Sequence, residues 1–263
     1  IKHAKLHLTS NGTLGGDTCE LNNIIKSPAT CGFGAGSYFP MSSSVPEQSG
    51  DQRADDAYSL CFDDNPSKTT IDIVGRPKIK LTLKSDNQYG HLCVRLCDVS
   101  PEGSSTRITY GLLNLTHRES HENPTPIPVD KEFSIELELD QIAYRLLPEN
   151  KLRISLSNAY WPLVWPVAEQ ATLTLVKGEL LLPIRQKSDK PEYVFSDPEA
   201  ASPWSRKIIR EPSYSNKIIT DQMTNAVTIE IFDDYGIVED NNHGLQIGTV
   251  VREAFSIHPN DPL

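Results

Sequence analysis

Apolar and polar residues alternate with a period of two over most of the middle and end of the chain. Strict alternation over about four to eight residues is typical of β-strands with one buried face. Turn-forming residues such as Gly75-Arg-Pro77 and Pro148-Glu-Asn150 separate these runs. The strands predicted from this pattern are 4–8, 70–74, 78–83, 91–99, 106–116, 133–139, 151–157, 171–176, 207–210, 226–232 and 245–257.

Two of these runs define faces clearly. In 78–83 (KIKLTL), Ile79, Leu81 and Leu83 lie on one face. In 91–99 (HLCVRLCDV), the leucines and the valine between them share one side of the strand, and the other side carries His91, Cys93, Arg95 and Cys97. We expect the aliphatic faces of both strands to point into a core.

Helical periodicity is scarce. Only 140–147 (DQIAYRLL) comes near it, and we interpret that segment as one helical turn or an irregular crossing. Many short strands, few helices and frequent prolines favour an all-β chain, folded as an antiparallel β-sandwich of the jelly-roll type.

Three zones follow from the pattern. Residues 1–58 are rich in glycine, serine and asparagine, and predict an irregular N-terminal arm with one strand, packed on the sandwich. Residues 59–185 form the jelly-roll core. Residues 186–263 begin with a polar, proline-containing crossing and predict a C-terminal extension with added strands.

The composition limits the kinds of binding partner that we expect. The chain has 263 residues, 38% of them hydrophobic and 23% charged, with a net charge of -10. That charge repels a phosphate backbone, and no run of about 18 apolar residues is present, so we expect neither a nucleic-acid nor a membrane partner. The N-terminus shows no signal peptide, and the C-terminus ends without a capping element. We therefore expect a fragment of a longer protein.

The five cysteines, Cys19, Cys31, Cys61, Cys93 and Cys97, are odd in number and include no CxxC pair. An odd count in a chain of this length is typical of free, mostly buried thiols in a reducing compartment. We therefore expect a cytoplasmic protein without structural disulfides.

Residues 30–40 (TCGFGAGSYFP) are the stretch that most resembles an active-site motif. A nucleophile turn needs Gly-x-Ser-x-Gly, and no serine in the chain has glycines at both positions. The three glycines do not form GxGxxG and are not followed by the lysine of a phosphate-binding loop. We predict no catalytic residue in this chain and no bound cofactor.

Metal binding is also not expected. His117-Arg-Glu-Ser-His121 is not HExxH and follows a predicted strand, so a solvated turn is the favoured interpretation. Cys93 and Cys97 lie on one strand face about 13 Å apart, too far to join in a disulfide or share a metal ion.

The segment 158–166 (NAYWPLVWP) contains two of the three tryptophans, Trp161 and Trp165. One interpretation is a hydrophobic plug at a corner of the sandwich. The other is a carbohydrate platform or a contact with another domain, on a turn stiffened by its prolines.

From residue 71 onward the sequence resembles a known family. The runs IDIVGRPKIKLTLKSD, HLCVRLCDVSPEGSSTRITYGLLNLTHRESHENP and PVDKEFSIELELDQIAYRLLPENKLRISLSNAYWPLVWP resemble the C-terminal domain of CocE/NonD hydrolases, in the X-Pro dipeptidyl-peptidase and cocaine-esterase-like (peptidase S15) superfamily. SGDQRADDAYSLCFDD resembles the Asp-Gln-Arg element of that family.

This resemblance implies a galactose-binding-like jelly roll behind an α/β-hydrolase domain that carries the catalytic Ser, Asp and His. The partner would be that catalytic domain of the same protein, and the parent would hydrolyse acyl esters or X-Pro dipeptides. The chain departs from the family at Pro148-Glu-Asn150, where a Gly-His is usual; we expect Asn150 to take the positive-φ position.

The resemblance also implies a role for the arm. In cocaine-esterase-like members, the loop before the Asp-Gln-Arg element helps to wall the acyl side of the substrate pocket. Here that loop ends before Asp51-Gln-Arg53, and Phe33, Tyr38 and Phe39 are the residues we expect to line the pocket. A carbohydrate-binding module using Trp161 and Trp165 is the alternative, and homo-oligomerisation is left open.

Overall fold

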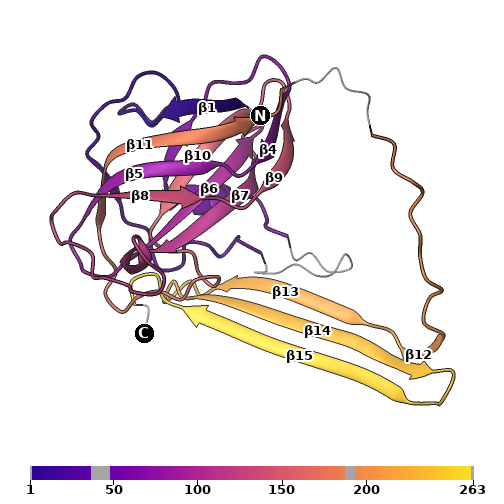
Figure 1. The fold of residues 1–263 in the computed structure, drawn as a ribbon. Coiled ribbons are helices and arrows are strands. Elements are labelled where there is room, and N and C mark those ends of the chain that lie inside the picture. Colours follow the sequence, from indigo (N-terminus) through magenta and orange to yellow (C-terminus); the bar gives the residue numbers. More distant parts are fainter. Residues whose placement is uncertain (1, 37–47, 187–192, 262–263) are drawn as a thin grey trace. The chain divides into compact units, whose positions relative to one another are not determined.

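A computed structural model describes residues 2–36, 48–186 and 193–261. The chain divides into two compact units, Ile1–Gln186 with His258–Leu263, and Lys187–Ile257. All strand pairing between the named strands is antiparallel, in three sheets. The all-β class predicted from the alternation is therefore confirmed (Figure 1).

The first unit holds two sheets. The seven-stranded sheet contains β8 (Phe133–Glu138), β5 (Lys78–Ser85), β11 (Leu173–Ile184), β4 (Ile71–Gly75) and β9 (Ile142–Leu146), with β1 (Lys2–His7) and β2 (Asn23–Ile25) also paired to β11. The four-stranded sheet contains β3 (Leu60–Asp63), β10 (Lys151–Ser157), β6 (His91–Val99) and β7 (Ser105–Asn114). Short helices are α1 (Arg53–Ala57) and the 3₁₀ turn η1 (Leu115–His117).

Side chains from both sheets build one core. Ile79, Leu81 and Leu83 of β5 and Leu92 and Leu96 of β6 are at most 2% exposed and belong to one cluster. The predicted aliphatic faces of these two strands are therefore confirmed as core faces. At about 25 cal/mol per Å² of apolar surface, burial of this cluster is the main force that holds the two sheets together.

Both faces of β6 are buried. Its aliphatic side faces the core, and its other side, with Cys93, Arg95 and Cys97, is also buried. The arm that precedes β3 supplies partners to this second side, because Gln52 and Ser59 both accept hydrogen bonds from Arg95. The fold thus holds the arm against the outer face of the four-stranded sheet.

Two local predictions are wrong. Residues 142–146 form strand β9, paired with β4, and not a helical turn. At the turn after β9, the positive φ of 68° belongs to Glu149 and not to Asn150. Asn150 instead donates a hydrogen bond from Nδ2 to Oδ1 of Asp98 (2.9 Å), which fixes the turn to β6.

The second unit is one sheet, which we call the terminal sheet. It consists of β12 (Arg206–Arg210), β13 (Ser213–Thr220), β14 (Val227–Asp240) and β15 (Gln246–Ile257). Strand β14 is central and pairs with all three others. The alternation in the sequence does not predict strand β13.

Candidate functional site

The loop that contains Phe33 lies directly on the tryptophan-containing corner. Gly32 has φ +108°, and a Cβ atom at this position would lie 2.6 Å from the backbone carbon of Tyr160 and 2.7 Å from the nitrogen of Trp161. The amide of Trp161 donates a hydrogen bond to the carbonyl of Cys31 (2.8 Å). Only glycine allows this contact between the two backbones. The structure therefore brings together two segments about 130 residues apart in the sequence.

A buried carboxylate holds the same loop from the other side. Asp55, in α1, accepts hydrogen bonds from the amides of Gly32 (2.8 Å) and Gly34 (3.1 Å). Burial raises the pKa of Asp55, while the two amide hydrogen bonds and the charge of Arg95 act against that rise. Asp55, which is 1% exposed, thus binds both ends of the segment from Gly32 to Gly34.

The Asp-Gln-Arg element supplies the next contacts. Gln52 is fully buried and donates from Nε2 to the carbonyls of Gly34 (3.0 Å) and Gly50 (2.9 Å). Its Oε1 accepts a hydrogen bond from Arg95 (3.0 Å). Asp51 pairs with Arg53 at the surface, at 2.7 Å. Gln52 therefore links the loop to the strand below it.

Arg95 and Asp56 form the centre of a buried polar cluster. Nη2 of Arg95 lies 3.0 Å from Oδ1 of Asp56, and both side chains are almost fully inaccessible. Asp56 also accepts hydrogen bonds from Ser105, Ser155 and Arg153. A buried ion pair repays its desolvation only when its remaining polar atoms are hydrogen-bonded. The carboxylate of Asp56 has such partners, and both Nη atoms of Arg95 are bonded, whereas the buried Nε of Arg95 has no partner among the described residues.

Cys31, Cys93 and Cys97, in and beneath the arm, are buried thiols. Burial raises the pKa of Cys31 and of Cys97 to about 12, and that of Cys93 further. The thiolate is the nucleophile and the metal ligand, so these thiols are neither at neutral pH. All five cysteines are free thiols in the structure.

The predicted site residues fall into three groups. Trp161 is fully buried, in agreement with the interpretation of a hydrophobic plug. Trp165 is 57% exposed, so its ring can contact another molecule. Phe33 is partly buried beside Gly32. Tyr38 and Phe39 lie outside the described residues.

Two hollows adjoin the corner. The first, of about 190 Å³, is lined mainly by apolar groups from β6, β7 and the corner, including Leu112, Tyr160 and Val164. The second, of about 470 Å³, is lined by Tyr89, Asn114, Val167, Ala168 and Glu169. Asn114 borders both. Hollows of this kind accept apolar side chains from a neighbouring surface.

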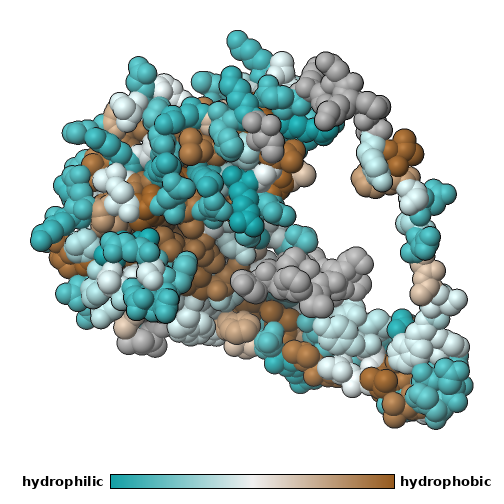
Figure 2. Space-filling model, in the orientation of Figure 1, coloured by the Kyte–Doolittle hydropathy of each residue, from teal (hydrophilic) through white to brown (hydrophobic). Residues whose placement is uncertain are grey.

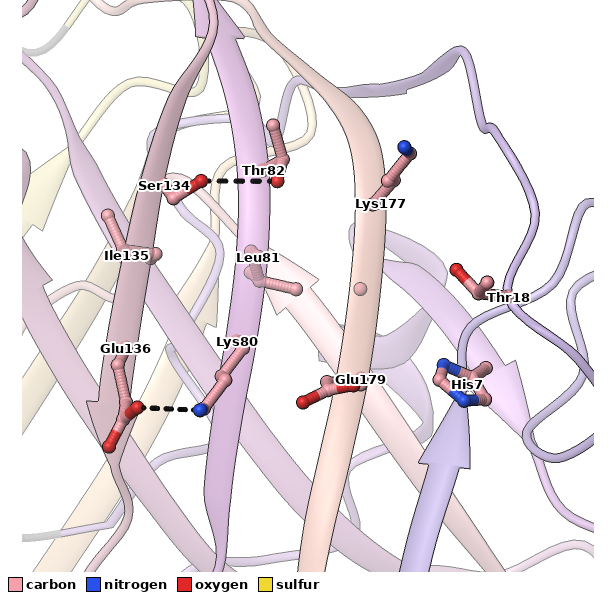
Figure 3. Close-up of a pocket in the computed structure, with 11 residues that line it drawn as sticks. His7, Thr18, Lys80, Leu81, Thr82, Ser134, Ile135, Glu136, Lys177 and Glu179 are labelled. Carbon is pink, nitrogen blue, oxygen red and sulfur yellow. Dashed lines mark hydrogen bonds and ion pairs between the residues drawn. The ribbon is translucent and has the colours of Figure 1, made fainter.

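A further groove, of about 430 Å³, crosses the outer face of the seven-stranded sheet. Figure 3 shows that its side chains bind one another: Lys80 pairs with Glu136 (3.1 Å), and Thr82 shares a hydrogen bond with Ser134 (3.3 Å). The imidazole of His7 is the one aromatic ring among the residues that line this groove. Polar cross-strand pairs of this type stabilise a solvated sheet face, and we assign no chemistry to the groove.

The described residues support neither a metal site nor a carbohydrate-stacking surface at the Trp corner. Across residues 2–36, 48–186 and 193–261, no group of three or more His, Cys, Asp or Glu is arranged to hold a metal ion. The rings of His117 and His121 lie 5.6 Å apart without such a group. Because Trp161 is buried, the corner does not present two indole rings to a sugar.

No helix in the described part of the chain is long and apolar enough to cross a membrane.

Sequence reasoning missed the residues that position the loop, namely Asp55, Asp56 and Arg95. Two signals were present. The sequence QRADD places two adjacent acids in a short segment before β3, and Arg95 stands within the apolar run from Leu92 to Cys97. A lone arginine among cysteines on a strand face indicates a buried partner of opposite charge.

Comparison with known proteins identifies a family. The sequence model for the X-Pro dipeptidyl-peptidase C-terminal non-catalytic domain matches residues 4–218. None of the curated proteins compared with the chain matches it.

Solved structures share the fold at low sequence identity. An α-amino acid ester hydrolase has 18% identity and a TM-score of 0.57, over 69% of this chain and 36% of that chain. An aminopeptidase from a marine sediment archaeon, Thaumarchaeota archaeon, has 16% identity and a TM-score of 0.58, over 70% and 36%. A CocE/NonD family hydrolase from Staphylococcus aureus has 13% identity and a TM-score of 0.52, over 70% and 37%. The chain spans about a third of the length of these proteins.

Proposed function

The chain belongs to the family of C-terminal non-catalytic domains of X-Pro dipeptidyl-peptidases, and from this premise we propose that it docks on an α/β-hydrolase catalytic domain of the same protein. The docking surface would be the loop Thr30–Gly36 together with the corner 158–168. The reaction would be hydrolysis of acyl esters or X-Pro dipeptides, carried out by the catalytic domain.

The observation that carries this proposal is the way the loop is held. Gly32 contacts the corner, Asp55 binds two loop amides, and Gln52 binds the carbonyl of Gly34. A loop that must meet a reacting site in another domain needs a rigid support, because misplacement by about 1 Å lowers catalysis strongly. Exposed Trp165 and the two hollows at the corner add apolar surface beside it.

Within this proposal, Phe33, Tyr38 and Phe39 wall the acyl side of the substrate pocket. Their apolar rings would exclude water from the acyl group, and the acyl group would gain affinity by burial. The residues for nucleophilic attack would come from the catalytic domain, since this sequence has no Gly-x-Ser-x-Gly turn.

We also assign the first unit to the galactose-binding-like jelly roll. Support comes from two antiparallel sheets that share one core, together with the resemblance to hydrolases that carry such a domain.

The pocket role is tested by Phe33→Ala in a longer protein that includes the segment upstream of Ile1. The expected result is a several-fold rise in KM for substrates with large acyl groups and little change in kcat, because the ring contributes binding in both ground and transition states. Ile24→Ala, at a 54%-exposed position on β2, is the matched control and should leave both constants unchanged. Equal KM values for wild type and Phe33→Ala would reject the pocket role while leaving the non-catalytic assignment intact.

A further inference from the structure

The terminal sheet has four strands in the part of the chain that the structure describes, and Val227, Ile229 and Ile257 are its buried apolar residues. Among its large apolar side chains, Ile218 is 51% exposed, Val250 is 50% exposed and Ile247 is 47% exposed. Figure 2 shows apolar residues, in brown, distributed along this sheet among polar ones. A sheet of so few strands usually needs further pairing or a second layer to be stable.

The two edges of this sheet differ in composition. One edge is formed by β12 and β13, which are interrupted at Pro212 and carry the cations Arg206, Lys207, Arg210 and Lys217. Prolines, breaks and cationic side chains are the usual means by which proteins prevent strands from adding to an edge.

The other edge is β15, which has neither a proline nor a break and carries a single cation. It is 12 residues long, with no proline and no lysine, and its only charged residues are Arg252 and Glu253. Among the described residues, β15 pairs with β14 and with no other strand. Within the terminal sheet, the outer edge of β15 is therefore a continuous row of backbone donors and acceptors that no described strand occupies.

The strand register assigns the side chains to two faces. Ile229 lies opposite Ile218 on one side and Phe255 on the other, so these three side chains share a face. Ile231 and Val251 follow the same alternation on this face. We call it the apolar ribbon face; the opposite face carries more charge, with Lys217, Glu230 and Arg252 in three neighbouring strands.

We propose that a second copy of this chain pairs its β15 with this β15, antiparallel about a two-fold axis at Val251, and so continues the terminal sheet. A two-fold axis perpendicular to the sheet keeps the apolar ribbon face of both copies on one side, and the axis then passes through one residue position. The midpoint of Gln246–Ile257 falls between Val251 and Arg252, so an axis at one of these positions gives the longest overlap.

Charge selects between these two registers. An axis at Arg252 places two arginines directly opposite each other, which is unfavourable. An axis at Val251 places valine opposite valine, Thr249 opposite Glu253, and Val250 opposite Arg252, with no like charges opposed. On the apolar ribbon face this register also places Ile247 of one copy opposite Phe255 of the other.

The size of the interface is adequate. An overlap of nearly the whole of β15 gives about ten backbone hydrogen bonds, which is typical of a specific protein interface. Pairing also joins the two apolar ribbon faces into one surface of twice the width, with apolar cross-strand contacts that each sheet lacks alone.

The test measures mass and register together. Sedimentation equilibrium on the full chain should give twice its mass of 29.3 kDa. Mild oxidation of Val251→Cys should link two chains, because directly opposed Cβ atoms lie about 4.5–5.5 Å apart. Val250→Cys and Arg252→Cys should each fail to link to themselves, since residues displaced by two positions lie about 7–8 Å apart, but a mixture of the two should cross-link.

A charge variant provides a second measurement. Val251→Lys places two cations opposite each other and should give a monomer with an unchanged circular dichroism spectrum. Asn216→Lys adds the same charge on the opposite edge strand and should remain dimeric. Three results would each overturn the proposal: a monomeric wild type, a dimeric Val251→Lys variant, or a dimer in which Val251→Cys does not cross-link. They would mean that β15 pairs with another domain or with no partner.

Discussion

The amide of Gly32 donates a 2.8 Å hydrogen bond to Oδ1 of Asp55, which lies in the middle of α1. Through this bond, α1, which follows directly on Asp51 and Gln52, holds the loop that carries Phe33. The same glycine contacts the backbone of Tyr160. One residue therefore couples the loop, the helix and the tryptophan-containing corner.

Gly32→Ala should destabilise the chain by about 2–4 kcal/mol, from a positive φ and from overpacking against the Tyr160 backbone. Gly103→Ala is the matched control, because Gly103 has φ +87° but a Cβ atom added to it would meet no other atom within 4 Å. It should cost only about 1–2 kcal/mol. Urea unfolding measures both free energies, and equal losses would show that the contact with the corner contributes nothing.

The buried pair of Arg95 and Asp56 should be strongly coupled. Arg95→Met leaves the Asp56 carboxylate buried with fewer partners and should lower the free energy of unfolding by about 3–5 kcal/mol. The double variant with Asp56→Asn should cost less than the sum of the two single changes. Arg145→Met removes an exposed pair with Asp72 and should have little effect. Additive losses at Arg95 and Asp56 in urea titrations would contradict the network.

Asp63 should make stability depend on acid pH. Burial acts to raise its pKa, but hydrogen bonds from Arg153 and Lys151 outweigh this, and the pKa lies below its ordinary value of 3.8. A carboxyl whose pKa is lower in the folded state stabilises the fold above the unfolded value and loses that contribution as pH falls through the folded value.

Asp63→Asn should therefore be less stable than wild type at neutral pH, and the difference should shrink below pH 3.8. Urea midpoints of both proteins from about pH 7 to about pH 2 measure this difference. A gap that stays constant, or widens in acid, would mean that Asp63 does not bind Arg153 as a carboxylate.

Alternation predicted most of the core strands because their two faces meet different environments, but it missed β2, β3 and the second half of β11. Alternation does not predict a strand whose two faces meet similar environments. Strand β13 (SYSNKIIT) is largely exposed on both sides and is paired through its backbone to β14, so its side chains carry little alternation. In 142–146 the alternation is present, with Ile142, Tyr144 and Leu146 less exposed than their neighbours, but the flanking DQ and LL disguise it.

The candidate site shows a similar division. The loop before the Asp-Gln-Arg element and the Trp corner were both identified from sequence, but their contact through Gly32 was not, since close approach of two backbones leaves no pattern beyond a single glycine. The exposure of Trp165 and the burial of Trp161, four residues apart, depend on the path of the corner. Pairing between Arg95 and Asp56 joins two distant segments, which one sequence cannot reveal.

The central claim is that this chain serves a catalytic serine located elsewhere. Labelling with a serine-reactive fluorophosphonate, followed by peptide mass spectrometry, tests it most directly. Residues 1–263 alone should show neither label nor ester hydrolysis, and a longer protein that includes the upstream segment should be labelled at one serine before Ile1, with loss of activity. A labelled serine within residues 1–263, accompanied by inhibitor-sensitive hydrolysis, would contradict the account.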